Sequence, residues 1–170
     1  MALAKQRGSE TIEFIESRLE GKFQLESNRE KTRVVDRREE GASLNFLGYT
    51  FRYDRDRKGR ARKYLNVFPS KQAVQREREK LHEKTNSHQC FKPIPTLIGE
   101  LNRHLKGWAN YFSIGYPMSA YCEIERYVQG RLIQHLKRRS QRPYRPPQGE
   151  KWLRHLARLG LIRLSALAHA

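Results

Sequence analysis

The chain has 170 residues, which is enough for one ordinary domain or two small ones. Its 35 Lys and Arg residues against 18 Asp and Glu give a formal net charge of +17, so a polyanion is the expected partner. Hydrophobic residues make up 37% of the chain, which excludes a disordered basic tail. An anionic membrane surface is a weaker alternative, because no stretch approaches the ~20 apolar residues of a spanning helix.

The N-terminus and the cysteines indicate the compartment. The first ten residues, MALAKQRGSE, contain no continuous apolar segment, so they do not resemble a secretory signal. Cys90 and Cys122 lie far apart without a CxxC pair, which is typical of reduced thiols and not of a disulfide framework. These features predict a cytoplasmic protein that does not use a membrane as its partner.

Residues 1–68 are predicted to form a mixed region of one helix and several strands. Ser9 is a predicted cap for a short helix that ends near Gly21. Strands are expected over residues 23–25, 32–35, 44–53 and 64–68, the first two as a small hairpin. The charged run over residues 54–63 is predicted to be an exposed loop or hairpin turn.

The pattern becomes helical after Pro69. Ser70 is a predicted N-cap, and helices are expected over residues 70–84, 96–112, 117–138 and 151–159. A proline-rich loop over residues 140–149 precedes the last helix, which Gly160 ends. The predicted fold class is therefore α+β, with a strand-rich region over residues 1–68 and an α-helical domain over residues 69–170.

The helix predicted near residues 97–112 has two chemically different faces. At ~100° per residue, the apolar side chains fall in one stripe, formed by Leu97, Leu101, Leu105, Trp108 and Phe112. Arg103, Lys106 and Asn110 fall on the opposite side, where they can meet solvent or phosphate. His104 lies near the edge of the apolar stripe without a partner at metal-ligand spacing, so we interpret it as a core or boundary histidine.

Three basic clusters are candidate RNA contacts. The first crowds the predicted turn beside two tyrosines on which unpaired bases can stack, and comprises Arg52, Arg55, Arg57, Lys58, Arg60, Arg62 and Lys63. The second runs into the proline-rich loop and comprises Arg131, Lys137, Arg138, Arg139, Arg142 and Arg145. The third is the face of Arg103, Lys106 and Asn110. In the helix predicted over residues 70–84, basic residues alternate with Glu77 and Glu79, which is typical of a solvated surface.

Two groups of potential metal ligands favour a simpler interpretation. Asp54 and Asp56 lie in the arginine-rich run, so we interpret them as charge partners of neighbouring cations. His82, His88 and Cys90 lie close together, but their spacing matches no zinc pattern and a fourth ligand is not in view. The sequence therefore predicts no metal site at either place.

Four segments in order resemble the C-terminal part of group II intron reverse transcriptase/maturases. Residues 101–112, LNRHLKGWANYF, resemble the signature of the maturase-specific domain, which is also called domain X or the thumb. Residues 44–51, LNFLGYTF, are similar to the last conserved motif of the polymerase palm, and residues 25–36, LESNREKTRVVD, to the motif before it. The segments HLKRRSQRPYRPP and KWLRHLARLGLIRL fit the family's tail.

The resemblance implies the end of a right-hand palm over residues 1–68 and an α-helical thumb over residues 69–170. It implies binding of structured group II intron RNA to assist splicing. In a complete polymerase the same parts hold an RNA/DNA template-primer during reverse transcription. It also implies that Lys31 lies near the palm's active site, so Lys31 joins the expected nucleic-acid contacts.

The sequence departs from that family in the residues of polymerase chemistry. Reverse transcriptases hold two Mg²⁺ ions with a (Y/F)xDD turn and a further Asp, and this chain has no DD pair. We therefore expect no catalytic residue and no cofactor in this chain, with Mg²⁺ only in a complete parent polymerase. Two alternatives stay open: one piece of a split RNA-directed DNA polymerase that needs a separate palm polypeptide, or a decayed remnant without function.

Overall fold

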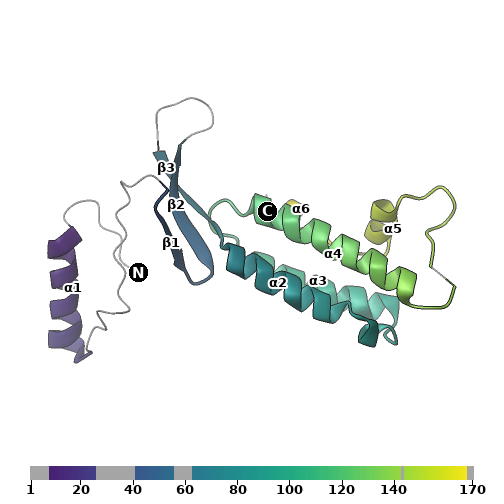
Figure 1. Cartoon of the computed structure of the whole chain (residues 1–170), viewed down its shortest axis with the longest axis horizontal. Coiled ribbons are helices and arrows are strands. Elements are labelled where there is room, and N and C mark those ends of the chain that lie inside the picture. The colour runs from purple at the N-terminus through teal and green to yellow at the C-terminus, as the bar shows by residue number, and fades with distance from the viewer. Residues whose placement is uncertain (1–7, 26–40, 56–62, 143, 168–170) are drawn as a thin grey trace. The chain divides into compact units, whose positions relative to one another are not determined.

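The computed structural model describes residues 8–25, 41–55, 63–142 and 144–167 (Figure 1). Its contacts divide the chain into two compact units, Met1–Ala42 and Ser43–Ala170. The described residues form α-helices, one short 3₁₀ turn and one three-stranded antiparallel sheet, which confirms the predicted α+β class.

In the first unit, the described residues form a single helix, α1 (Gly8–Phe23). It begins one residue before Ser9, the predicted cap. The helix ends where Gln24 takes a positive φ of 55° and the N–H of Leu25 donates to the carbonyl of Leu19 at 3.0 Å. This bond satisfies one of the carbonyls that a helix end otherwise leaves free.

The two strands of the hairpin predicted over residues 23–25 and 32–35 have different outcomes. The strand expected over residues 23–25 is wrong, because α1 extends through Phe23 and the two residues that follow are not in a strand. A helix in progress gains one backbone hydrogen bond per added residue, which favours its extension over a three-residue strand. The other strand, over residues 32–35, lies outside the described residues.

The second unit begins with a sheet in the order β1 (Ser43–Phe46), β2 (Tyr49–Arg55) and β3 (Lys63–Pro69). The single strand predicted over residues 44–53 is wrong, because a turn at Leu47 and Gly48 divides it into β1 and β2. Both turn residues have positive φ values, 49° and 80°, and such a two-residue turn matches the right-handed twist of paired strands. The strand predicted over residues 64–68 is confirmed as part of β3.

Four predicted helices are confirmed with small changes at their ends: α2 (Lys71–Lys84), α3 (Ile94–Tyr111), α4 (Met118–Arg138) and α5 (Trp152–Arg158). Ser70 caps α2 as predicted, because its side-chain oxygen accepts from the N–H of Ala73 at 3.2 Å. Two short elements were not predicted, the 3₁₀ turn η1 (Ser87–Gln89) and α6 (Leu164–Leu167).

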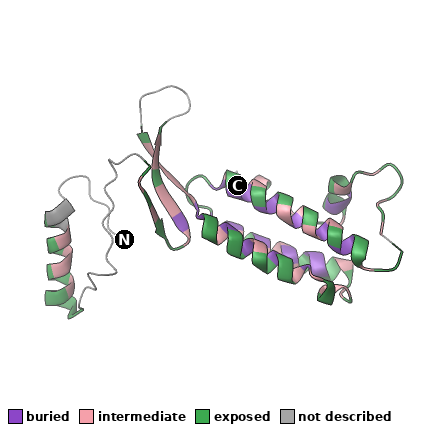
Figure 2. Cartoon of the chain, in the orientation of Figure 1, coloured by how far each residue is buried: buried purple, intermediate pink, exposed green. Residues whose placement is uncertain are grey.

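The core of the second unit lies between α2, α3, α4 and the C-terminal helices. Figure 2 shows buried residues on the inward sides of the helices. The fully buried side chains are mostly leucines, one group from each helix: Leu81, Leu97, Leu101, Leu105, Leu132, Leu136, Leu156 and Leu164. Burying each such side chain contributes about 1.5–3 kcal/mol, so this cluster is the main source of stability.

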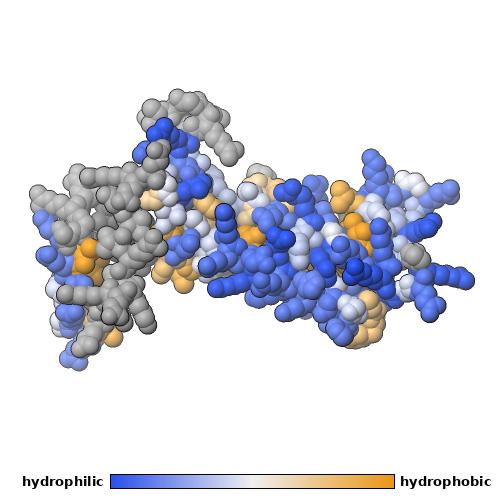
Figure 3. Space-filling model, in the orientation of Figure 1, coloured by the Kyte–Doolittle hydropathy of each residue, from blue (hydrophilic) through white to orange (hydrophobic). Residues whose placement is uncertain are grey.

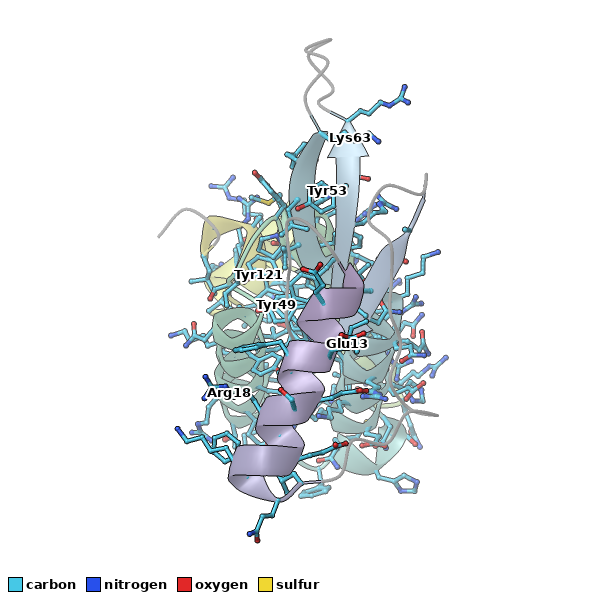
Figure 4. The ribbon with its side chains drawn as sticks, turned by 90° about the vertical axis from the view of Figure 1, so that its left-hand side faces the viewer. Glu13, Arg18, Tyr49, Tyr53, Lys63 and Tyr121 are labelled. Atoms are coloured by element: carbon cyan, nitrogen blue, oxygen red, sulfur yellow. The ribbon has the colours of Figure 1, made fainter. Side chains whose placement is uncertain are left out.

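The sheet joins the helices through the β1–β2 turn and the end of α3. The hydroxyl of Tyr49 donates to the carbonyl of Tyr111, and the hydroxyl of Tyr111 donates to the carbonyl of Leu47 at 2.9 Å. The rings of Tyr49 and Phe112 lie 5.0 Å apart, a distance typical of aromatic pairs. Tyr121, which is labelled in Figure 4, donates to the carbonyl of Ala109 at 2.6 Å.

The loop after α3 meets β3 at a place that accepts only glycine. The N–H of Tyr116 donates to the carbonyl of Val67 at 2.7 Å, which adds a backbone bond between the loop and the sheet. Gly115 has a φ of 84°, and a Cβ at this position would lie 2.2 Å from that carbonyl oxygen. Both the backbone conformation and the contact therefore exclude a side chain.

We predict that Gly115→Ala lowers the free energy of unfolding by about 2–4 kcal/mol, because left-handed strain and a backbone clash add. Gly160→Ala is the matched control, since Gly160 has a φ of 93° and a Cβ there would meet nothing within 4 Å. The control should cost only about 1–2 kcal/mol. Urea unfolding followed by circular dichroism measures both, and equal losses would contradict the proposed clash.

Candidate nucleic-acid interface

The first basic cluster lies at the end of the β2–β3 pair where Arg55, the last residue of β2, is opposite Lys63, the first residue of β3. The loop predicted over residues 54–63 is wrong at its ends, because Asp54 and Arg55 belong to β2 and Lys63 belongs to β3. Strand pairing extends to these residues, and the rest of the predicted loop lies outside the described residues. Figure 4 labels Lys63, the first residue of β3, and Tyr53 on the neighbouring strand β2. The remaining predicted contacts of this run lie outside the described residues: Arg57, Lys58, Arg60 and Arg62. Lys31 also lies outside them.

Arg52 is engaged within the sheet. Its Nε lies 2.7 Å from Oδ1 of Asp54 and its Nη2 lies 2.9 Å from Oδ2, a bidentate ion pair. The hydrogen bond to Asp54 raises the pKa of Arg52 above its usual value. The guanidinium also lies 5.5 Å from the centre of the Phe68 ring. Asp54 is therefore a charge partner as predicted, and Arg52 must lose that partner before it can pair fully with a phosphate.

The third cluster, on α3, is arranged as predicted. Leu97, Leu101 and Leu105 are buried. Arg103, Lys106 and Asn110 are all exposed on the other side of the helix. Among the described residues, neither cation of this group forms an ion pair. A phosphate could therefore contact both cations without displacing a carboxylate.

His104 is a boundary histidine, as the sequence predicted. It is half-buried, and its Nε2 lies 2.9 Å from Oε1 of Glu77 on α2. Glu77 is buried, with a side chain that is 2% exposed, so His104 is a polar partner for a carboxylate in the core. The periodic pattern of charges on α2 predicts a solvated Glu77, which is wrong because this position faces α3.

The second cluster combines exposed and enclosed cations. Arg138, Arg142 and Arg145 are exposed, and the ammonium of Lys137 lies 5.7 Å from the centre of the Trp152 ring. Two other arginines differ from their neighbours. Arg131 donates from Nε to the hydroxyl of Thr85 at 3.2 Å, and Arg139 has a buried Nη1 without a hydrogen-bond partner among the described residues. Charge density in the sequence does not distinguish these two environments.

The loop that carries Arg142 and Arg145 is fixed to α5 by contacts that the sequence analysis missed. The hydroxyl of Tyr144 and Nε2 of His155 lie 2.7 Å apart, and Nδ1 of His155 lies 2.9 Å from Oε2 of Glu150. His155 is only 2% exposed, so its two ring nitrogens depend on these partners. In the sequence, the only sign of these contacts is Tyr144 among prolines, and this pattern does not identify His155 as its partner.

Outside these clusters, the described residues can be compared with the requirements of a metal site, a disulfide and a membrane-spanning helix. In the residues that the structure covers, no three His, Cys, Asp or Glu side chains are grouped so that they could hold a metal ion. Cys90 and Cys122 are free thiols, as predicted. Among the described helices, none combines the length and the apolar character needed to cross a membrane. In the view of Figure 3, the helical part presents a mostly hydrophilic surface.

We predict that Tyr144→Phe lowers the free energy of unfolding by about 1–3 kcal/mol, because it leaves a buried nitrogen of His155 without its partner. Tyr116→Phe is the matched control, since Tyr116 is 59% exposed and its hydroxyl forms no described hydrogen bond. It should change stability by less than about 0.5 kcal/mol. Equal effects of the two substitutions in urea unfolding would show that the Tyr144 hydroxyl does not fix the loop.

A comparison with protein-family models finds a match to the group II intron, maturase-specific domain, over residues 74–154. A search of curated proteins finds no match. The matched region covers nearly all of α2, then α3, α4 and the start of α5, so it contains the α3 face and the proline-rich loop. The match confirms the resemblance that the segment LNRHLKGWANYF indicated, and this chain therefore carries a group II intron maturase-specific domain.

Proposed function

We propose that this protein binds structured group II intron RNA through its maturase-specific domain and thereby assists splicing. The observation that carries the proposal is the exposed face of Arg103, Lys106 and Asn110 on α3, which lies inside the matched region. Neither cation forms an ion pair with a described acid, although the charge of Arg103 helps to lower the pKa of Glu100, so both can contact phosphates. Each neutralised phosphate releases condensed counterions, which is the main source of affinity for a polyanion.

Two further surfaces support the proposal. Arg138, Arg142 and Arg145 are exposed where α4 ends and the proline-rich loop begins, and contacts to α5 fix this loop. The hairpin end supplies Lys63 and the neighbouring basic run. Phosphate contacts position an RNA without reading its sequence, so we expect specificity to come from RNA shape.

In this proposal, residues 1–68 are the end of a polymerase palm and residues 69–170 are the thumb. In a complete polymerase, the same surfaces would hold an RNA/DNA template-primer, and Mg²⁺ would enter with the palm carboxylates. RNA binding by charge and shape needs no catalytic residue in this chain. The free thiols fit a reducing compartment, so we place the activity in the cytoplasm.

We predict a steep salt dependence of RNA binding. With about six phosphate contacts, affinity for a labelled group II intron RNA should fall about 10³-fold between roughly 50 and 200 mM salt. Fluorescence anisotropy over a series of KCl concentrations measures this slope. Failure to bind the RNA at low salt, or a flat response to salt, would overturn the proposed function.

We also predict that charge reversal on α3 weakens RNA binding more than the same change on α2. Arg103→Glu with Lys106→Glu should weaken binding by at least about tenfold, because two phosphate contacts become repulsive. Arg76→Glu with Lys80→Glu is the matched control, since it alters net charge equally on an exposed helix surface with mixed charges. The control should weaken binding by less than about threefold.

Circular dichroism should show that both double variants keep the helical fold, because all four side chains are exposed. Replacing Arg55, Arg57 and Arg60 together by Glu tests the hairpin end in the same assay. Unchanged binding in that triple variant would make the run a solvated surface. An equal loss from the α2 and α3 pairs would show that only overall charge matters, and would remove the α3 face from the interface.

A further inference from the structure

The connection between α2 and α3, residues 85–93, presents an aromatic side chain to solvent. Phe91 is 78% exposed, more than any other large hydrophobic side chain in the described part of the chain, and it is not part of the core. Three residues earlier, His88 is also exposed. A single exposed apolar side chain is common on protein surfaces, so the exposure of Phe91 gains its meaning from the backbone and the charges around it.

The backbone that carries Phe91 is ordered by local hydrogen bonds. Three backbone bonds of 3.1–3.2 Å, each spanning three residues, hold the segment from Asn86 to Lys92. Pro93 follows with a φ of −57°, which its ring fixes, and α3 begins at the next residue. The ring of Phe91 is therefore presented from a fixed backbone, which lowers the entropy cost of binding a partner at this position.

The connection is also anchored to α4. Nδ1 of His135 lies 3.2 Å from the carbonyl oxygen of Thr85, and Nε of Arg131 donates to the hydroxyl of Thr85 at 3.2 Å. Figure 1 shows the connection and the last turns of α4 at the same end of the helical part. Arg138 follows Arg131 by seven residues, two turns along the same side of α4, and it is exposed. An exposed cation therefore lies on the side of α4 that meets the connection.

An unpaired RNA base fits this surface better than a protein does. A protein interface would continue the apolar surface around Phe91, whereas its exposed neighbours Ser87 and His88 are polar. Unpaired bases of structured RNA stack singly on aromatic side chains, and cations contact the phosphates beside them. An isolated exposed ring near a cation supplies both contacts.

We propose that Phe91 stacks against an unpaired base of the bound RNA, in a bulge or a loop, and that Arg138 contacts a phosphate beside that base. The inference rests on the proposed RNA-binding function and adds a feature of the RNA that the chain recognises. Because stacking requires a base that has left its own helix, this contact distinguishes unpaired from paired RNA, which phosphate contacts alone do not.

The experiment compares the full wild-type chain with Phe91→Ala and Phe91→Trp. The probes are two hairpin RNAs that differ by one bulged nucleotide, with 2-aminopurine at the bulge as a fluorescent reporter of stacking. Phe91→Ala should weaken binding of the bulged hairpin about five- to thirtyfold, as expected for the loss of one stacked base, and leave binding of the paired hairpin unchanged. Phe91→Trp should keep the affinity, because a larger ring also stacks.

Leu153→Ala is the matched control, since Leu153 is a large apolar side chain that is 59% exposed and has no aromatic ring. It should bind both hairpins as the wild-type chain does. Both alanine variants should melt within about 2 °C of wild type, because both side chains are exposed. Phe91→Ala should keep the salt dependence of binding, whereas Arg138→Glu should reduce it, because only a phosphate contact releases counterions.

Failure of this inference and failure of the proposed function give different results. If Phe91→Ala binds the bulged hairpin and quenches 2-aminopurine as wild type does, the inference is overturned and RNA binding stands. The inference is also overturned if Leu153→Ala loses as much affinity, or if the wild-type chain binds the two hairpins equally well. A wild-type chain that binds neither hairpin at low salt contradicts both proposals.

Discussion

Burial of the apolar stripe of α3 is the constraint on which the rest of this structure depends. Leu97, Leu101 and Leu105 are each no more than 1% exposed, and α3 cannot rotate about its axis without bringing them into water. Because a helix advances ~100° per residue, their burial keeps Arg103 and Lys106 in solvent. The direction of the cationic face is thus a consequence of core packing.

The end of α3 also joins the helical part of the second unit to the sheet. Helices leave their last carbonyls without hydrogen-bond partners, and here tyrosine hydroxyls donate hydrogen bonds to two of these carbonyls. Tyr121 donates to the carbonyl of Ala109, and Tyr49 donates to that of Tyr111. Burial raises the pKa of both Tyr49 and Tyr121 above the ordinary tyrosine value. The sheet and the bundle therefore share one set of buried contacts.

The basic residues of this chain differ mainly in whether other side chains already engage them. Arg52 is held by Asp54, Arg131 by Thr85, and Arg139 has an enclosed guanidinium nitrogen. Arg103 and Lys106 form no ion pair in the described part of the chain, although Glu100 lies close enough to Arg103 for their charges to interact. Counting basic residues finds every cluster but cannot rank them, because the rank depends on neighbours that are distant in sequence. The Arg131–Thr85 contact, for example, spans 46 positions.

The sequence by itself determined the long helices, the two faces of α3, the Ser70 cap and the identity of the maturase-specific domain. Each of these rests on local periodicity, a local hydrogen bond or a contiguous motif. Only the tertiary structure decided that Glu77 is buried beside His104, that Tyr144 meets His155, and that Leu47 and Gly48 form a turn inside an apparently continuous strand. The two side-chain pairs depend on distant partners, and the turn is stabilised by strand pairing and by packing of Gly48 against Phe112, which no local pattern encodes.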